Sequence, residues 1–578
     1  MANLSQSKRE EMLEFLNKIK AEHQDDETLM AINEIENALT EKKYGLVWEE
    51  HTERVDEEMV NNIPIFTEIE DRKIKNSESN DYNFLIEGDN LHSLKLLEKT
   101  HKGKIDVIYI DPPYNTGNKD FKYNDNYVDK DDGFRHSKWL SFMSERLKIA
   151  KKLLNEKGII LISIDEKEQA QLKLLCDEIF EEANMLSTHH LQVRYTNKSL
   201  NEDNDWQPVM EYVYIYAKNK LLFKANKPFE KYDLSKFCYE ITELTKGETV
   251  EIAGKKVTIF KDKEWKIEKK DEGKVGYLKE TWASGSLINQ SGTASEFLSK
   301  YLIQRKEIDG LKVLYKIHNM GEEGDGLGYR YVSGPRKETA IRGKFYSGVP
   351  LERIEELKSG KSIKTRPIVN LYDYSGEFGN IRHEGKVAFN SGKKPIKLIK
   401  ELINYYIDKN ITILDFFAGS GTTGHAVMQL NKEDGGNRKY ILCTNNENNI
   451  CEEITYQRLQ NIQNELPHNL KYFKTGFIPK FSENEESSIK YKMLNHIKEL
   501  IELEYMCEID GINNILVRDE EEFDEIVNEN MKENIRLFVS SDIFASKEQQ
   551  LILEQKNIEK IEIPEYYYRS ELREVGEL

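Results

Sequence analysis

Short apolar runs alternate with helix-spaced segments over residues 81–184. The runs FLIEGDN, IDVIYID and GIILISID are continuous rather than alternating, which is typical of strands buried on both faces. Between them, HSLKLLEKT and Trp139–Leu154 place apolar residues three and four positions apart, as one face of a helix requires. A third such segment, EQAQLKLLCDEIF, follows the last run. The pattern predicts a β-α-β-α-β-α order and a parallel sheet covered by helices on both sides.

The same alternation returns after a long interruption. Residues 185–385 have no steady period and are rich in Gly, Tyr, Lys and Arg. From residue 386, KKPIKLIKELINYYI reads as a helix, TILDFFAGSG as a strand and loop, HAVMQLN as a helix and KYILCTNNE as a strand. The helical segment ICEEITYQRLQNIQ completes the series. We therefore expect one α/β fold that is interrupted by an insertion of roughly 200 residues.

The two ends of the chain have patterns of their own. In the first 80 residues, Met12, Phe15, Leu16 and Ile19 follow the spacing of one helical face, which favours a packing or interaction surface over a catalytic one. Beyond about residue 482, a helix over Ile489–Leu503 and strands at NILV and IRLFVSS indicate an acidic α/β region. The expected organisation is an N-terminal helical arm over 1–80, two halves of a core over 81–184 and 386–481, an inserted α+β domain over 185–385 and a C-terminal α/β domain over 482–578.

The composition is that of a folded protein with an acidic balance. Of the 578 residues, 38% are hydrophobic, which is sufficient for a core. The 84 Lys and Arg against 103 Asp and Glu give a net charge of −19, which excludes a wholly basic nucleic-acid coat but permits a local basic groove. Basic residues interleaved with aromatic ones, suited to phosphate contact and base stacking, gather in the insertion, with ordinary surface and core as the alternative for each residue. These clusters are Arg194-Tyr195, Tyr329-Arg330-Tyr331, Arg336-Lys337 and the run from Arg342 to Tyr346.

Three features argue against a membrane, secreted or zinc-binding protein. The apolar runs are too short to span a bilayer. The opening sequence MANLSQSKREEMLEFLNKIK carries charges where a signal peptide has an apolar core. The five cysteines form no C-x-x-C pair, and their odd number does not suit a disulfide framework. We expect a cytoplasmic protein in a reducing environment, with no metal site and no membrane contact.

The sequence Asp111-Pro112-Pro113-Tyr114 directly follows the run IDVIYI. Ligands of open α/β sheets bind beyond the carboxyl ends of strands. Two successive prolines fix φ and remove two N–H donors, which leaves carbonyl groups free as acceptors. A carboxylate beside a free carbonyl offers two acceptors for one exocyclic amine, and the tyrosine ring can stack on the base that carries it. The alternative is a plain strand-to-loop turn, which this motif alone does not exclude.

A second candidate is the stretch DFFAGSGTTG from Asp415 to Gly424, between a predicted strand and a predicted helix. Glycines let the backbone approach a ligand, and a helix N-terminus favours an anion. The stretch is not the G-x-G-x-x-G of pyrophosphate binders, and the chain contains no G-x-x-x-x-G-K-[ST] P-loop. Such a turn suits a small anion, for example the carboxylate of an amino acid. The alternative is a glycine-rich turn in a fold that binds no nucleotide.

Together, the two motifs resemble those of the S-adenosylmethionine-dependent amino-methyltransferases of DNA. The catalytic motif precedes the cofactor motif, as in the β group of these enzymes, in which the intervening insertion is the target recognition domain. DPPYNTG, the stretch DFKYNDNYVD…HSKWLSFM, the ending YYYRSELREVGE and the early KKYGLVWEEHTE are also similar to the Mod subunit of type III restriction–modification systems. The resemblance implies a Rossmann-like α/β methyltransferase core with a circularly permuted motif order.

The resemblance assigns several residues to binding S-adenosylmethionine. The methionine-end loop of the family is matched at Asp415, Phe417, Gly419, Ser420 and Gly421. Thr422 and Thr423 are expected to cap the following helix and to reach the cofactor carboxylate. Lys394 and Pro395, on the helix before the loop, match residues that line the methionine pocket, and Asp165 matches a strand near the cofactor more weakly.

The ribose and adenine ends of the cofactor have candidates on two other strands. Glu447 ends the strand KYILCTNNE, where an acid can bind both ribose hydroxyls, and Asn445 is a neighbouring candidate. The alternative for Glu447 is to cap the helix that starts near Ile450. The strand FLIEGDN is expected beside the DPPY strand, so that Asp89, with Asn90, resembles the residue that contacts the adenine of the cofactor. Asp89 can at the same time cap the helix HSLKLLEKT.

The implied reaction is methyl transfer to adenine N6 in duplex DNA. Asp111 and the carbonyl of Pro112 would accept the two amine hydrogens and direct the nitrogen lone pair at the methyl group, without a metal or a covalent enzyme intermediate. The base must first leave the duplex, at a cost of a few kcal/mol, and stacking on Tyr114 contributes roughly 1–3 kcal/mol. The preference for adenine N6 over cytosine N4 comes from the family, because Asp occupies the first motif position.

The family also implies partners: duplex DNA, a second copy of the chain in a homodimer, and a Res subunit with helicase and nuclease functions. Other interpretations stay open. An orphan or type II adenine methyltransferase would lack Res, and a DNA-binding recognition subunit would have lost catalysis, against which the intact motifs argue. An enzyme that acts on RNA or on protein glutamine can share the loop, but the insertion and the permuted order disfavour it.

Overall fold

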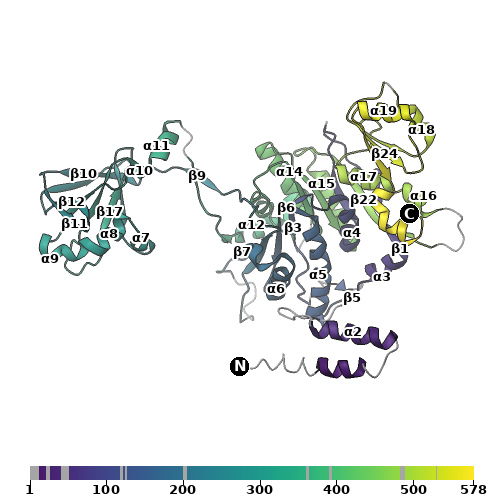
Figure 1. The fold of residues 1–578 in the computed structure, drawn as a ribbon, viewed down its shortest axis with the longest axis horizontal. Coiled ribbons are helices and arrows are strands. Elements are labelled where there is room, and N and C mark those ends of the chain that lie inside the picture. Colours follow the sequence, from purple (N-terminus) through teal and green to yellow (C-terminus); the bar gives the residue numbers. More distant parts are fainter. Residues whose placement is uncertain are drawn as a thin grey trace. The chain divides into compact units, whose positions relative to one another are not determined.

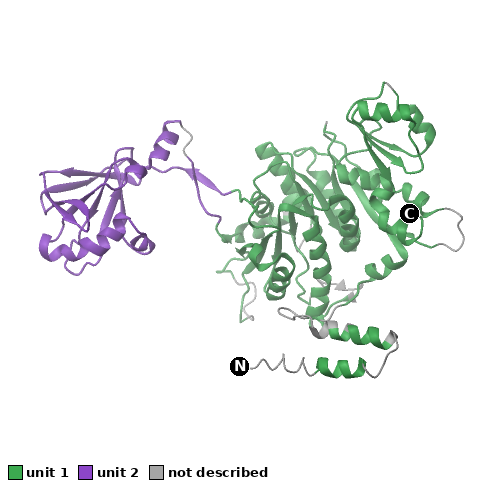
Figure 2. Ribbon diagram, viewed as in Figure 1, with its two compact units in different colours: residues 1–226, 369–578 green, residues 227–368 purple. Residues whose placement is uncertain are grey.

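The structure is a computed structural model, and it describes residues 12–20, 26–40, 48, 51–77, 79–117, 122–123, 126–198, 205–359, 363–388, 393–481, 488–528 and 530–578. The chain divides into two compact units, unit 1 of residues 1–226 and 369–578 and unit 2 of residues 227–368 (Figure 2). Unit 2 interrupts unit 1 in the sequence, as the long insertion predicts.

Unit 1 is built on a ten-stranded mixed sheet (Figure 1). In spatial order its strands are β1 (Asn62–Glu68), β22 (Leu470–Pro479), β2 (Asn83–Glu87), β21 (Lys439–Thr444), β20 (Thr412–Asp415), β3 (Ile105–Ile110), β6 (Leu154–Ile164), β8 (Met210–Ala217), β7 (Met185–Gln192) and β19 (Leu371–Asp373). The block from β22 to β6 is parallel throughout, and β1 and β8 join its two ends antiparallel. The parallel α/β core predicted from the continuous apolar runs is therefore confirmed.

Two groups of helices accompany this sheet. In the first, α4 packs against α5 and α5 against α6; in the second, α13 packs against α14 and α14 against α15. Their bounds are α4 (Asn90–His101), α5 (Arg135–Leu153), α6 (Gln169–Phe180), α13 (Ile396–Ile403), α14 (Thr422–Asp434) and α15 (Gln457–Asn461). Helix α5 buries Trp139, Met143, Leu147 and Ala150 completely, on the face that its spacing predicts. Burial of each large side chain of this kind stabilises the fold by about 1.5–3 kcal/mol.

The position of β2 corrects one expectation. The strand FLIEGDN does not lie beside the DPPY strand, because β21 and β20 separate β2 from β3. The strand next to β3 is β20, which pairs Ile413 with Val107 and Leu414 with Ile108. The second half of the core thus inserts between strands of the first half, so neighbours in the sequence are not neighbours in the sheet.

Unit 2 contains an eight-stranded antiparallel sheet with short helices, in agreement with an α+β insertion. Its strands, in spatial order, are β11 (Glu248–Ile252), β12 (Lys255–Phe260), β15 (Leu314–His318), β16 (Tyr329–Ser333), β17 (Lys344–Ser347), β14 (Leu278–Trp282), β10 (Phe237–Glu243) and β13 (Trp265–Lys269). Its helices are α7 (Ser286–Asn289), α8 (Ala294–Phe297), α9 (Lys306–Asp309), α10 (Glu322–Asp325) and α11 (Leu351–Lys358), and β9 (Phe229–Lys231) pairs with β18 (Ile363–Thr365). The unit is narrower than the expected 185–385 boundary, because β7, β8 and β19 complete the sheet of unit 1.

The terminal segments also belong to unit 1. The N-terminal arm contains a helix over 12–20, α2 (Asp26–Thr40) and α3 (Arg54–Asn61), but it ends before residue 80 because β1 is a strand of the main sheet. On its predicted apolar face, Leu16 is buried whereas Met12 and Phe15 are more than half exposed.

The C-terminal region has the predicted strands, but not as a separate unit. The helix expected over Ile489–Leu503 is two helices, α16 (Ile489–Leu494) and α17 (Ile497–Tyr505), and α17 packs against α4 and β1. The remaining elements are β23 (Asn514–Val517), α18 (Glu520–Ile526), β24 (Arg536–Ser540), α19 (Lys547–Gln555), β25 (Glu559–Ile563) and α20 (Glu565–Glu574), with the three strands in one parallel sheet. No helix among the described residues is long and apolar enough to cross a membrane.

Candidate active site

The two predicted motifs come together at one edge of the main sheet. Asp111 directly follows β3, and Asp415 is the last residue of β20. Because β3 and β20 are adjacent and parallel, their carboxyl ends lie side by side. Open α/β sheets bind their ligands at this edge, where neighbouring strands lead into helices of different groups.

Three polar side chains gather around the carboxylate of Asp111. The hydroxyl of Tyr114 donates to Asp111 Oδ1 at 2.8 Å, and Lys394 Nζ lies 3.2 Å from the same oxygen. Lys394 Nζ also donates to the Tyr114 hydroxyl at 2.6 Å and to Glu211 Oε2 at 3.0 Å. The structure therefore brings Lys394, predicted to line the methionine pocket, into the cluster around Asp111.

Glu211 is a member of this cluster that the sequence did not reveal. It lies in β8, and its Oε2 also accepts from the Tyr114 hydroxyl at 3.2 Å. The run MEYVYIYA around it falls in the segment that shows no steady period, and no motif surrounds it. Glu211 reaches the site only because β8 pairs antiparallel with β6, which sets Tyr212 opposite Ile164 at the end of that strand.

The cluster holds two carboxylates and one ammonium group in a nearly closed space. Burial raises the pKa of Asp111, and the charge of Lys394 opposes this effect. For Lys394, burial disfavours the charge, but Asp111 and Glu211 overcome it and raise the pKa above its usual value. Lys394 is thus a permanently charged donor in contact with Asp111.

The two proline carbonyls of the loop after Asp111 differ in their contacts. The indole N–H of Trp139 donates to the carbonyl of Pro113 at 2.8 Å and holds the loop against α5. For the carbonyl of Pro112, by contrast, the described residues supply no donor. The pair of acceptors at Asp111 and the Pro112 carbonyl stays a prediction, and the convergence of Tyr114 and Lys394 on Asp111 is more than a plain strand-to-loop turn requires.

A second buried carboxyl group, that of Glu168, holds the loop after Asp111 through a contact with Asn115. Asn115, with φ of 57°, donates from Nδ2 to Glu168 Oε1 at 2.5 Å, and His136 Nδ1 lies 2.7 Å from the same oxygen. Glu168 Oε2 and Asn115 Oδ1 are both buried without a hydrogen-bond partner. Burial raises the pKa of Glu168 to about 8. A protonated Glu168 can donate to Asn115, which removes both unpaired atoms.

We predict that Glu168→Gln makes the free energy of unfolding less dependent on pH. The pKa of Glu168 is raised from 4.5 to about 8 by folding, so its contribution to stability is complete below pH 4.5 and is lost as the pH rises to 8. Gln mimics the protonated acid, so its advantage over the wild type in free energy of unfolding should grow by about 1–3 kcal/mol between pH 5 and pH 8. Urea unfolding at these two pH values measures the difference; an advantage independent of pH would show that Glu168 does not titrate in this range.

The glycine-rich loop is fixed from inside by Asp415. Its carboxylate accepts from the N–H of Phe417 at 3.0 Å and from the hydroxyl of Thr423, and burial raises its pKa to about 7. Gly421 precedes α14 with φ of 73°, and a Cβ there would lie 3.1 Å from Thr455 Cγ2. A side chain at Gly419, with φ of 48°, would meet only a distant carbonyl. The loop surface at Gly419 is therefore open to a ligand.

Two expectations for this loop are wrong. Neither Thr422 nor Thr423 caps α14, because Gly421 occupies the N-cap position and the threonine hydroxyls point elsewhere. Thr423 bonds to Asp415, and Thr422 Oγ1 accepts from Arg458 Nη1 at 2.8 Å. Arg458, fully buried on α15, was not suggested by any motif, although it also reaches Ser420 Oγ at 3.2 Å. Burial lowers the pKa of Arg458 to about 10.

Glu447 and Asp89 lie at the ends of the next two strands, β21 and β2. Glu447 accepts from the hydroxyl of Tyr127 at 2.9 Å. The alternative role for Glu447 is wrong, because Asn446 Oδ1 accepts from Cys451 N at 3.1 Å and so caps the following helical turn. Asp89 does cap α4, with Leu91 N donating at 2.7 Å, and its side chain is still 40% exposed.

The remaining predicted residues either bond to other parts of the protein or lie away from the cluster around Asp111. Both polar atoms of the Asn90 side chain have partners: Nδ2 donates to Phe416 O at 2.8 Å, and Oδ1 accepts from Arg146 Nε at 2.6 Å. Pro395 is buried at the N-cap of α13, and Asn445 is exposed. Asp165 follows β6 and accepts from Lys167 N at 2.8 Å, and burial raises its pKa to about 6.

The basic–aromatic clusters of the insertion separate into core and surface residues. Tyr331 and Tyr346 are buried, and their hydroxyls bond to Glu243 and Glu280, so the core alternative holds for these two. Exposed members of the clusters are Arg336, Lys337 and Arg342 in unit 2, and Arg194 and Tyr195, which lie in unit 1. Unit 2 carries 28 Lys and Arg against 22 Asp and Glu, a net charge of +6 in a chain of net charge −19.

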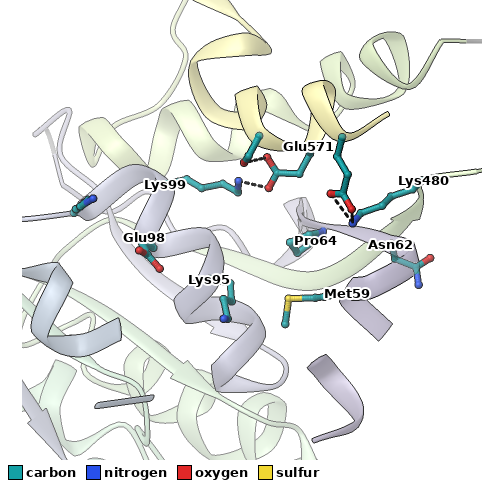
Figure 3. Close-up of a pocket in the computed structure, with 11 residues that line it drawn as sticks. Met59, Asn62, Pro64, Lys95, Glu98, Lys99, Lys480 and Glu571 are labelled. Carbon is teal, nitrogen blue, oxygen red and sulfur yellow. Dashed lines mark hydrogen bonds and ion pairs between the residues drawn. The ribbon is translucent and has the colours of Figure 1, made fainter. Parts of the chain in front are cut away.

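A pocket of about 400 Å³ lies elsewhere in unit 1, where α3, β1, α4 and α20 meet (Figure 3). Lys99 and Glu571 point toward each other across it and form an ion pair, and Lys480 pairs with Glu574 at 2.9 Å. None of its eleven lining residues belongs to either motif. Among the described residues, no three His, Cys, Asp or Glu side chains form a group that could hold a metal ion. All five cysteines are free and buried.

Comparisons with known proteins agree with the motifs. A family model described as DNA methylase matches residues 105–457. The type III restriction-modification enzyme StyLTI Mod subunit of Salmonella typhimurium is 31% identical over 67% of this chain and 56% of its own length. The EcoP15I Mod subunit of Escherichia coli is 30% identical over 72% of this chain and 66% of its own length. The type II methyltransferase M.KpnI of Klebsiella pneumoniae is 32% identical over 64% of this chain and 82% of its own length. The chain spans about half to two thirds of the type III relatives it matches.

Among solved structures, the chain is similar to PvuII DNA methyltransferase, described as cytosine-N4-specific, with a TM-score of 0.31 and 12% identity over 68% of this chain and 95% of that one. A DNA modification methylase from Thermus thermophilus has a TM-score of 0.30 and 11% identity over 68% and 99%.

Proposed function

Because this chain belongs to the DNA methylase family, we propose that it transfers a methyl group from S-adenosylmethionine to the N6 amine of adenine in duplex DNA. The observation that carries the proposal is the pair of acceptors at Asp111 and the Pro112 carbonyl, just after the strand β3 that pairs with β20, the strand before the glycine-rich loop. An exocyclic amine has two hydrogens for these two acceptors.

The residues at the ends of β20, β21 and β2 fit the cofactor in chemistry and in order. The open loop at Gly419 suits its amino-acid end, Glu447 its ribose and the region of Asp89 its adenine. Glu447 already accepts from a hydroxyl, that of Tyr127, in the way it would accept from a sugar. When bound, S-adenosylmethionine supplies an electrophilic methyl group.

The protein acts on the amine by position and by charge. Hydrogen bonds from N6 to Asp111 and the Pro112 carbonyl draw the nitrogen lone pair out of conjugation with the ring. The N–C bond would form as the bond between the methyl group and the sulfonium sulfur breaks, which leaves a neutral thioether. N6 would then be cationic and would lose one proton, for which Asp111 is the receiving base. Its pKa is raised by burial, which makes it a better acceptor than an exposed carboxylate. Tyr114 holds the flipped base by stacking, and holding the reactants in place can lower a barrier by about 7–11 kcal/mol.

We assign DNA recognition to unit 2. Its net charge of +6 and its exposed Arg336, Lys337 and Arg342 suit contact with phosphates, which makes binding sensitive to salt. The acidic remainder of the chain does not attract DNA in general, so a local basic unit is required for productive binding.

We further propose that the chain is the Mod subunit of a type III restriction–modification system, acting in the cytoplasm as a homodimer with a Res helicase–nuclease subunit. Similarity to four Mod subunits supports this assignment. A type II methyltransferase without a nuclease partner is the second candidate, because the chain covers 82% of M.KpnI. A Res-type reading frame beside the gene, and its product copurifying with this chain, would distinguish the first candidate from the second.

The test of the proposed activity uses the purified chain, methyl-labelled S-adenosylmethionine and plasmid DNA. We expect label in N6-methyladenine at one short sequence, which methylated-base sequencing of the same DNA then identifies. Label in cytosine, or transfer to RNA but not to duplex DNA, would contradict the proposal. A chain that binds S-adenosylmethionine and transfers nothing to any DNA would favour a recognition subunit without catalysis.

A further inference from the structure

The ammonium group of Lys394 lies at the reaction site, and the proposed methyl transfer gives it no role. Its Nζ is 3.2 Å from Asp111 Oδ1, and the side chain is only 7% exposed. It lies 2.6 Å from the Tyr114 hydroxyl but 4.9 Å from the centroid of that ring, so it sits at the hydroxyl end of the surface on which a base would stack.

Lys394 is held in this place by a group that does not need to move. Glu211 accepts from Nζ at 3.0 Å and is itself 17% exposed in the side chain, on a strand within the main sheet. An incoming amine can therefore take Asp111 as its acceptor while Glu211 keeps the ammonium group in position. Two of the three ammonium hydrogens are then available for Tyr114 and for one further acceptor.

Asp111 and Lys394 form an acceptor beside a donor, which is the complement of one edge of adenine. On its Watson–Crick edge, adenine presents the N6 hydrogens and, next to them, the lone pair of ring nitrogen N1. Guanine presents the reverse order, an oxygen acceptor followed by a ring N–H donor. Its oxygen would then face the carboxylate of Asp111, and its ring N–H would face the ammonium group of Lys394. Flipped bases are read on this edge by hydrogen bonds.

We propose that Lys394 donates a hydrogen bond to N1 of the flipped adenine while Asp111 accepts from N6. This inference rests on the proposed methyl transfer and makes Lys394 a residue that contacts the base and disfavours guanine, not only a neighbour of the cofactor. Glu211 is the positioning residue that keeps Lys394 charged and aimed.

The test replaces one ring nitrogen of the substrate. A duplex with the methylated sequence carries adenine, 1-deazaadenine or 3-deazaadenine at the target position, and kcat/KM is measured for each. For the wild type we expect a loss of roughly 10- to 100-fold with 1-deazaadenine, as for one hydrogen bond from a charged donor, and less than about threefold with 3-deazaadenine.

Lys394→Met removes the donor and keeps the length of the side chain. It should methylate adenine more slowly than the wild type and show no further loss with 1-deazaadenine. Comparing the ratio of the two substrates between the wild type and Lys394→Met cancels the different intrinsic reactivity of their amines. The control is Lys393→Met, since Lys393 is also buried but donates to Val387 O at 2.7 Å, away from Asp111; it should keep the wild-type ratio.

Equal loss with both deaza bases in the wild type would overturn the inference, and so would an undiminished 1-deazaadenine penalty in Lys394→Met. If Lys394→Met does not fold, the wild-type series can still overturn the inference, through equal losses with the two deaza bases. A wild type that methylates no unmodified duplex would instead contradict the proposed activity.

Discussion

Replacement of Asp111 by Ala is expected to slow methyl transfer by about 10²- to 10⁴-fold while leaving the affinity for S-adenosylmethionine within about threefold. Ala removes the acceptor for the amine and the base for its proton, but it leaves the glycine-rich loop and Glu447 unchanged. Single-turnover rates with saturating DNA measure the first effect, and calorimetry of cofactor binding measures the second.

Two other variants separate the role of the carboxylate from general damage to the site. Tyr114→Phe keeps the stacking ring and loses the hydroxyl bonded to Asp111, so it should be much less impaired than Asp111→Ala. Glu166→Ala, on the exposed loop after β6, should transfer like the wild type. Undiminished transfer by Asp111→Ala would remove Asp111 from the mechanism altogether.

Replacement of Lys471 by Met is expected to lower the free energy of unfolding by about 3–5 kcal/mol. Lys471 is fully buried in β22, 2.9 Å from Glu68 Oε1 and 2.8 Å from Glu502 Oε2. Met fills the space but removes the buried cation of both carboxylates, which leaves Lys498, 3.1 Å from Glu68 and 4.0 Å from Glu502, as the partner they share. Because Glu502 lies in α17, this ion pair also joins the C-terminal segment to the edge of the main sheet.

The matched controls for Lys471 are a surface pair and a compensating change. Lys148→Met breaks an exposed pair with Glu145 and should cost less than about 1 kcal/mol. Adding Glu502→Gln to Lys471→Met should recover part of the loss, because it removes one of the uncompensated charges. Urea unfolding measures all four proteins, and a loss below about 1 kcal/mol for Lys471→Met would mean that the buried carboxylates protonate at little cost.

The core of the fold was predictable because its signals are local. Strands such as β3 and β6 are continuous apolar runs, and Asp111 and Gly419 lie directly after strands whose ends must meet at one edge. The position of β2 was not predictable in the same way, because strand order in the sheet depends on which half of the chain inserts into the other.

The undetected site residues have no local signal. Glu211 is an acid in a strand of mixed polarity, and it reaches Asp111 only through the pairing of β8 with β6. Arg458 reaches Thr422 from α15, a helix that begins after the next strand, β21. In unit 2, β13 has no buried residue, and its alternation of large and charged side chains covers only five residues, which is a weak signal in a segment without a steady period.

The order of strands in the main sheet has a consequence for folding during synthesis on the ribosome. β2 ends at Glu87, but its partner β21 ends at Thr444, and β3 likewise waits for β20. At 5–20 residues per second, β2 therefore emerges roughly 20–70 s before its neighbour is complete. During that time the nascent chain must carry unpaired apolar strands while unit 2, contiguous in sequence, is free to fold. We expect the first half of the core to depend on chaperones during synthesis, and truncation before residue 412 to give insoluble protein.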